Sequence, residues 1–165
     1  MNQQQQVEPI RVRIISIGDV CSGKSGLIKR YCNPGRFVSQ HIPTIGVDYG
    51  IKTTNKTMDD GTPADVKVDF FDLSGDAAYS EVRNEFYSNV GGVLLVFDIT
   101  SRQSFESLDS WIKELRKYRI STENTTLVLI GNKADKYPRE VKEQEVSRML
   151  CKFKYECKYM PSISS

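Results

Sequence analysis

The sequence predicts an α/β protein built on a doubly wound, mostly parallel sheet with one antiparallel edge strand. Apolar, β-branched stretches alternate with amphipathic ones along the chain, which is typical of parallel strands connected by covering helices. Two strand-like stretches instead follow one another around an Asp-Gly turn, which indicates a hairpin and one antiparallel strand. With 165 residues, the chain is long enough for one domain with a sizeable core and too short for two.

The N-terminal part predicts a tail, a strand, a loop and a helix. Residues 1–9 are polar and low in complexity, so we expect a disordered tail there and a folded domain over 10–165. The β-branched, apolar stretch at 11–17 predicts a buried strand. A glycine-containing loop follows, and a short helix is expected over 25–32, where an Asn-Pro-Gly sequence ends it.

The predicted hairpin consists of strands over 47–54 and 66–71, on either side of the sequence MDDGTP. A helix near 79–87 follows it. The continuous apolar run GGVLLVFDI at 91–99 then predicts a central strand that is covered on both faces.

The second half continues the alternation. A helix with one apolar face is expected over 104–118, a buried strand over 126–131 and a helix over 140–153. The stretch at 154–160 predicts the last strand. A doubly wound sheet normally has one more helix over that strand, so we expect a missing final helix and a C-terminally short domain: either the chain is a fragment, or one flank of the sheet is poorly covered.

Composition excludes several classes of protein. The 23 Lys and Arg residues nearly balance the 21 Asp and Glu residues, which gives no reason to expect nucleic acid or an anionic membrane as partner. No apolar run approaches the roughly 18 residues of a membrane-spanning helix, and the glutamine-rich N-terminus lacks a signal-peptide core. Four cysteines show neither a zinc-site spacing nor a dense disulfide framework. We expect a soluble, intracellular, reduced domain.

The stretch GDVCSGKS at 18–25 fits the pattern G-x-x-x-x-G-K-[ST] at every fixed position, between a strand and a helix. Such a loop points backbone N–H groups at phosphate oxygens, and the helix N-terminus adds a positive dipole. Lys24 is expected to reach the β- and γ-phosphates and the Ser25 hydroxyl to ligate Mg²⁺. A chance glycine-rich turn fits this context less well. The predicted phosphate-binding residues are Gly18, Val20, Cys21, Ser22, Gly23, Lys24, Ser25 and Gly26.

A D-x-x-G sequence at 72–75 ends the predicted strand VKVDFFD. A carboxylate at a strand terminus can hold Mg²⁺ through water, which makes Asp72 a candidate metal ligand, and the Gly75 N–H can meet a γ-phosphate. By itself the pattern also fits any strand followed by a polar turn. Its combination with the phosphate loop favours the metal site.

An N-K-x-D sequence at 132–135 follows the buried strand TLVLIG. A carboxylate there can accept both the ring N–H and the exocyclic amine of guanine, whereas adenine presents an acceptor at the ring position. In isolation such a tetrapeptide is commonly a solvated turn. Because it occurs together with the other two motifs and in the same order along the chain as expected, it predicts that Asn132, Lys133 and Asp135 bind a guanine base.

With PTIGVDY at 43–49, these motifs resemble the small GTPases of the Ras superfamily, and IGVDYG is Rab-like. The stretches GLIKRYC, RFVSQHIPTIGVDYG and YSEVRNEFYSNVGGVLLVFDIT are most similar to the RBJ type of Rab-like GTPase, whose animal members carry a C-terminal J domain. The resemblance runs from about Arg11 to Met160. It implies the P-loop small GTPase fold, GTP or GDP and Mg²⁺ as cofactors, effector and regulatory proteins as partners, and a monomer.

The resemblance assigns further roles. Thr44 corresponds to the first-switch threonine that meets Mg²⁺ and the γ-phosphate, although it could also simply begin a strand. Phe37 matches the aromatic residue that packs over guanine, its alternative being a core phenylalanine. The last family motif is degraded to PSISS, so Ser162 and either Ile163 or Ser164 are candidates for contact with the guanine oxygen.

Two departures from the family pattern affect hydrolysis. Asp76 stands where the family has a glutamine that orients the attacking water, and its negative charge would face a γ-phosphate of the same sign. Other RBJ-type proteins also lack this glutamine, and Asp76 could still position a water. The branched side chain of Val20 would crowd the approach of water and of an arginine finger. We therefore predict slow hydrolysis, with catalytic candidates Lys24, Thr44, Gly75 and Asp76.

Three functional hypotheses follow. The first is a slowly hydrolysing guanine-nucleotide switch, whose partners read Ile45, Val47 and the helix at 79–87. The second is a GTP-bound interaction module with negligible hydrolysis, and the third a damaged or incomplete domain. The chain ends in Ser-Ile-Ser-Ser without a prenylation box, so we expect no lipid anchor and a cytoplasmic protein, with nuclear entry permitted by size.

Overall fold

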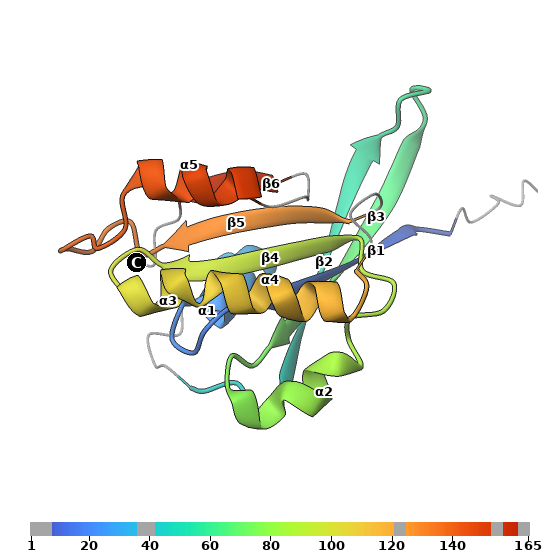
Figure 1. The fold of residues 1–165 in the computed structure, drawn as a ribbon. Coiled ribbons are helices and arrows are strands. Elements are labelled where there is room, and N and C mark those ends of the chain that lie inside the picture. The colour runs from blue at the N-terminus through green and yellow to red at the C-terminus, as the bar shows by residue number, and fades with distance from the viewer. Residues whose placement is uncertain (1–7, 36–41, 121–124, 153–156, 162–165) are drawn as a thin grey trace, which may run out of the picture.

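The structure, a computed structural model, describes residues 8–35, 42–120, 125–152 and 157–161. Within them, a six-stranded sheet forms the centre of the molecule (Figure 1). In spatial order the strands are β2 (Val47–Thr57), β3 (Pro63–Leu73), β1 (Ile10–Ile17), β4 (Gly92–Asp98), β5 (Thr126–Asn132) and β6 (Cys157–Pro161). β2 runs antiparallel to β3, and every other neighbouring pair is parallel. The predicted doubly wound sheet with one antiparallel edge strand is confirmed.

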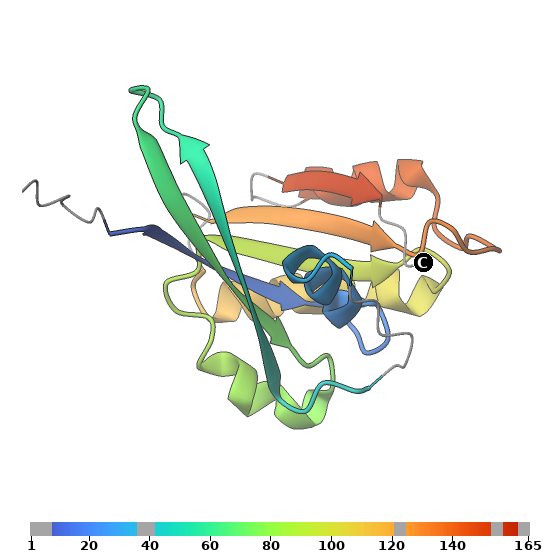
Figure 2. The same ribbon diagram turned by 180° about the vertical axis from the view of Figure 1, so that it is seen from behind.

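The β2–β3 hairpin is longer than the sequence predicts and projects beyond the rest of the sheet (Figure 2). Its turn is closed by Asp60, whose carboxylate accepts hydrogen bonds from the backbone N–H and the hydroxyl of Thr62 at 2.9 and 2.6 Å. Gly61 has a φ of 83°, a left-handed conformation that suits glycine. Because this turn is tight, pairing continues to Thr57 and Pro63.

The helices cover the sheet on both faces, as expected for a doubly wound fold. They are α1 (Lys24–Cys32), α2 (Ser80–Asn84), α3 (Arg102–Glu106), α4 (Leu108–Lys117), α5 (Glu143–Lys152) and the short 3-10 helix η1 (Ala77–Tyr79). α1 lies on one face, and α2, α3 and α4 lie on the opposite face (Figures 1 and 2). Among these helices of the described chain, none has the length and apolar character needed to cross a membrane.

Three helix boundaries differ from the sequence prediction. The helix expected over 104–118 is divided into α3 and α4 at Ser107, although the Ser107 backbone stays helical and its N–H still donates to the Gln103 carbonyl at 3.0 Å. α5 begins only at Glu143, because the Glu145 side chain accepts from the Lys142 N–H at 3.0 Å. The helix expected near 79–87 ends at Asn84 and is preceded by η1.

The main core lies between the sheet and the α4 face. Strands β4 and β5 contribute fully buried side chains such as Leu95, Phe97 and Leu129, and α4 contributes Leu108 and Leu115. On the α1 face, an apolar groove of about 420 Å³ lies where the sequence predicts a poorly covered flank. Its lining includes Ile14, Leu27, Tyr31, Phe70, Val128 and Met160. The parallel arrangement brings the carboxyl ends of β1, β3, β4 and β5 to one edge, where the predicted motifs lie.

Candidate functional site

The loop between β1 and α1 is held in a conformation that requires glycine. Gly18 has a φ of 137°, and a Cβ atom there would lie 2.1 Å from the Val96 carbonyl oxygen. Gly23 has a φ of 94°, and a Cβ atom there would lie 2.1 Å from Nδ2 of Asn132. The two fixed glycines therefore allow the loop to approach β4 and β5 closely.

Lys24 is the first residue of α1 and is 6% exposed, and its side chain is enclosed by this loop. Its Nζ donates to the backbone carbonyls of Gly18 and Asp19, both at 2.8 Å. Burial lowers the pKa of Lys24 to about 8, although the nearby Asp72 and Asp19 carboxylates oppose the shift. An ammonium carries three donors, so two bonds to the loop still permit a third to a phosphate.

The three predicted metal ligands lie next to one another. The Ser25 and Thr44 hydroxyl oxygens are 2.9 Å apart, and Thr44 donates to Asp72 Oδ2 at 3.3 Å. They come from α1, from the segment before β2 and from the end of β3. Hydroxyl and carboxylate oxygens are the ligands that Mg²⁺ prefers, so this donor set fits the expected ion.

Sequence reasoning missed a residue that orients one of these ligands. Ser16 is buried in β1, and its hydroxyl donates to Asp72 Oδ1 at 2.6 Å. This bond fixes the carboxylate while its other oxygen faces Thr44. A serine within the apolar run RVRIISI was the available signal.

The predicted base-binding residues tie the loop to the end of β5. Asn132 Nδ2 donates to the Ser22 carbonyl at 2.9 Å, and Lys133 Nζ donates to the Cys21 carbonyl at 2.8 Å. Asn132 Oδ1 and Ser22 Oγ are buried without a hydrogen-bond partner among the described residues. Buried polar atoms of this kind fit a ligand that supplies their partners. Asp135 lies on the surface at the end of the same turn.

Asp98, at the end of β4, forms an ion pair with Lys133 and was also missed by sequence reasoning. Lys133 Nζ donates to Asp98 Oδ2 at 2.5 Å. Burial by itself raises the pKa of Asp98, but hydrogen bonds from Lys133 and Thr100 outweigh it and hold the pKa below its usual range. The carboxylate thus stays charged and keeps Lys133 against the phosphate loop.

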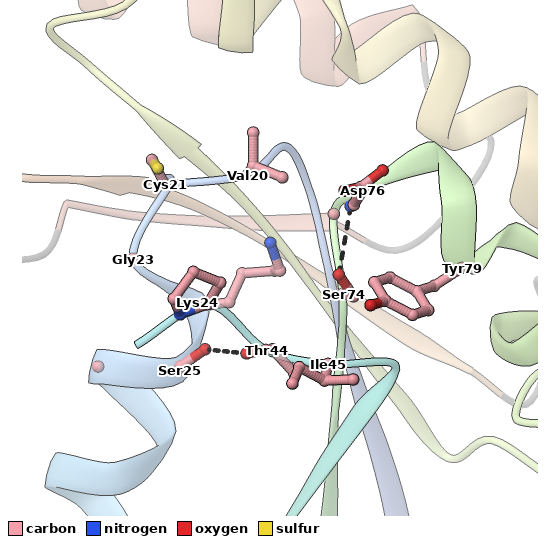
Figure 3. A pocket seen from close by; sticks show the side chains of 13 residues that line it. Val20, Cys21, Gly23, Lys24, Ser25, Thr44, Ile45, Ser74, Asp76 and Tyr79 are labelled. Atoms are coloured by element: carbon pink, nitrogen blue, oxygen red, sulfur yellow. Dashed lines mark hydrogen bonds between the residues drawn. The ribbon is translucent and has the colours of Figure 1, made fainter. Parts of the chain in front are cut away.

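The D-x-x-G segment rests directly on the phosphate loop. A Cβ atom at Gly75 would lie 2.5 Å from both the Gly18 oxygen and the Val20 nitrogen, so no larger residue fits there. The Asp76 carboxylate accepts from the Ala78 N–H at 2.9 Å and caps η1. It points toward the start of η1 rather than toward Lys24 (Figure 3).

A pocket of about 290 Å³ opens between these segments (Figure 3). It brings together most of the predicted phosphate, metal and catalytic residues, with Val20 58% exposed at its rim. The predicted residues in its lining are Val20, Cys21, Gly23, Lys24, Ser25, Gly26, Thr44, Gly75 and Asp76. Four predicted residues lie outside the described residues: Phe37, Ser162, Ile163 and Ser164.

Comparisons with known proteins agree with this geometry. The model of the Ras family matches residues 13–164. The protein named DnaJ homolog subfamily C member 27 from Danio rerio is 39% identical over 150 residues, which cover 89% of this chain and 53% of that protein. Its namesake from Rattus norvegicus is 40% identical over 136 residues, covering 81% and 48%. The chain thus spans about half the length of these curated relatives, and the predicted similarity to the RBJ type is confirmed.

Proposed function

This chain belongs to the Ras family, and from that premise we propose that it is a guanine-nucleotide switch that binds GTP or GDP with Mg²⁺ and hydrolyses GTP slowly. One observation carries the proposal: buried Lys24 and the hydroxyl groups of Ser25 and Thr44 line one pocket beside the phosphate loop, and the Asp72 carboxylate accepts a hydrogen bond from Thr44. A cation donor beside a set of hard oxygen ligands suits a nucleotide polyphosphate and its metal ion.

In the proposed complex, the protein groups bind and orient the nucleotide. Loop N–H groups and Lys24 would hold the phosphates, and Asp135 would accept from the guanine edge. When bound, Mg²⁺ would neutralise charge on the phosphate oxygens. Gly75 lies against the phosphate loop, so its N–H is close to where a γ-phosphate would lie.

The position and charge of Asp76 support the proposal of slow hydrolysis. One oxygen of its carboxylate accepts from the Ala78 N–H and caps η1, and in Figure 3 the side chain points toward η1 rather than toward Lys24. Its negative charge also disfavours the charge that develops on the transferred phosphoryl group. Exposed Val20 occupies the rim at which an activating protein would insert an arginine.

The same observation favours a second candidate function, a GTP-bound interaction module with negligible hydrolysis. In that case the GTP-bound conformation would persist, and partners would bind a surface that includes Ile45, which is 79% exposed beside the pocket. The two candidates differ only in the rate of turnover, because both need the same nucleotide site.

The test is to denature freshly purified protein and identify the released nucleotide by chromatography. Bound GDP would support the slowly hydrolysing switch, whereas bound GTP in near-stoichiometric amount would support the module. Protein that carries neither, and that fails to bind added GDP or GTP with Mg²⁺, would contradict both. A single-turnover rate with added GTP then measures the residual activity directly.

A further inference from the structure

Arg83 of α2 is buried beside the candidate site, with 3% of its surface exposed. Its Nη1 donates to the backbone carbonyls of Ser74 and Asp76, at 3.0 and 2.7 Å. These residues flank Gly75, so one guanidinium nitrogen holds the backbone on both sides of the glycine. A buried charge is stable only when it is paired and hydrogen-bonded, which couples the position of this segment to that of Arg83.

Glu114 of α4 pairs with the other side of the guanidinium. Arg83 Nε donates to Glu114 Oε1 at 3.1 Å and Nη2 donates to Oε2 at 3.3 Å, which is a two-pronged ion pair. The Tyr87 hydroxyl donates to the same carboxylate at 2.5 Å. Burial and this bond raise the pKa of Tyr87, so the phenol remains a donor.

Trp111 extends the network to the phosphate loop. The Arg83 guanidinium carbon lies 4.9 Å from the centre of the Trp111 ring, a cation–π contact. Trp111 Nε1 in turn donates to Asp19 Oδ1 at 2.7 Å. The network of Arg83, Glu114 and Trp111 thus joins α2, α4 and the phosphate loop through intramolecular contacts, none of which involves a nucleotide.

We propose that Arg83 is a positioning residue that holds the 74–79 segment in one arrangement against the phosphate loop, whichever nucleotide is bound. The inference rests on the proposed function for the existence of two nucleotide states. The lack of room for a side chain at Gly75 shows how closely the segment lies on the loop. The conformational change between the GDP and GTP forms is then confined to the segment around Thr44. A partner that distinguishes the two forms must therefore contact that segment.

Hydrogen exchange measured by mass spectrometry tests the proposal on the full chain. The chain is compared without nucleotide, with GDP and with guanylyl imidodiphosphate, a GTP analogue that is not hydrolysed. Amides of Asp76, Ala78 and Tyr79 report on the held segment, because each N–H is hydrogen-bonded within it. We expect them to exchange at the same rate in all three states, while amides near Thr44 slow by about tenfold or more with the analogue.

In Arg83→Ala, the rate of amide hydrogen exchange in the 74–79 segment should depend on which nucleotide is bound. Without the analogue its amides should exchange about tenfold faster than in the parent, and the analogue should restore part of the protection. Glu114→Gln is the milder second variant, since it keeps the shape of the partner and removes its charge, and Arg83→Lys should rescue only in part because lysine cannot form the fork. Arg116→Ala, on the exposed side of α4, is the matched control.

Trp111 is the single tryptophan of the chain and gives an independent readout. Its emission should be unchanged between GDP and the analogue in the parent and should become nucleotide-dependent in Arg83→Ala or Glu114→Gln. The proposal is overturned if the parent segment changes its exchange by tenfold or more between nucleotides, or if the Arg83 and Glu114 variants match Arg116→Ala. Failure to bind either nucleotide would contradict the proposed function alone, because the nucleotide-free comparison of parent and variants still tests whether Arg83 holds the segment.

Discussion

The two sides of the pocket are built differently. The phosphate-loop side, residues 18–25 with Asn132 and Lys133, is tied by side chains that donate to loop carbonyls, two of them buried (Lys24 and Asn132) and one half-buried (Lys133). The switch side, residues 43–45 and 74–79, carries exposed side chains such as Ile45, and its carbonyls at 74 and 76 accept from the single buried side chain of Arg83. The side chains proposed to bind phosphate and guanine are therefore concentrated on the phosphate-loop side, and Asp76, which we propose to slow hydrolysis, lies on the switch side.

This difference indicates that binding and turnover depend on separate features of the chain. Binding needs the loop conformation, which Lys24 stabilises through two backbone carbonyls. Turnover needs a group that orients water, and Asp76 uses its carboxylate to cap η1 instead. Substitutions on the phosphate-loop side should thus change affinity, whereas substitutions on the switch side should change rate.

The largest effect is expected from Lys24→Ala. The substitution removes the buried ammonium that organises the loop and its charge-assisted contact with phosphate, so affinity for GDP should fall about 100-fold or more. Competition against a fluorescent GDP derivative measures the loss. Lys113→Ala, an exposed position on α4, is the control and should leave affinity unchanged. A Lys24→Ala chain that binds within tenfold of the parent would show that the phosphate-loop side does not govern affinity.

Asp135→Asn should alter the choice of base with a somewhat smaller loss. The amide removes one acceptor for the guanine edge and adds a donor, so affinity for GTP should fall about 10- to 100-fold. Affinity for xanthosine triphosphate, which presents an oxygen where guanine has an amine, should rise. Competition by GTP, xanthosine triphosphate and ATP measures the preference, and Lys136→Ala on the same turn is the control. An unchanged preference for guanine would remove Asp135 from the site.

The phosphate-loop side could be predicted from sequence because its requirements are local. The glycines at 18 and 23 must adopt left-handed backbone conformations, and a lysine and a serine must begin the following helix, so the residues appear at fixed spacing. The strands could be predicted for a similar reason, since burial on both faces gives continuous apolar runs.

The supporting residues could not be predicted, because their partners are distant in sequence. Ser16 bonds Asp72 and Lys133 bonds Asp98 through tertiary contacts that no local pattern encodes. Arg83 resembles a solvated residue on a short helix, yet it is among the most buried charges described. The candidates Phe37 and 162–164 lie outside the described residues, so their roles stay predictions.

Asp76→Gln tests the proposed cause of slow hydrolysis on the switch side. Glutamine removes the negative charge and can orient a water, so single-turnover hydrolysis should rise about tenfold with little change in nucleotide affinity. Asp76→Asn is the matched variant, because it keeps a cap for η1 while removing the charge. A larger rise in Asp76→Gln than in Asp76→Asn would assign the gain to water orientation, and no rise in either would contradict the proposed cause of slow hydrolysis.

The smallest effect concerns stability rather than nucleotide. Because the pKa of Asp98 is held below its usual range in the folded state, the carboxylate stabilises the fold above its unfolded pKa of about 3.9, and this contribution is lost as pH falls through the folded value. Asp98→Asn should lower the free energy of unfolding by about 1 kcal/mol at neutral pH and reduce its loss in acid. Urea denaturation between about pH 3 and pH 7 measures both quantities, with exposed Asp59→Asn as control. If Asp98→Asn loses stability in acid as steeply as the parent, the Lys133–Asp98 pair is not what stabilises the phosphate-loop side, and the rigidity of that side must come from the backbone contacts of Lys24 and Asn132.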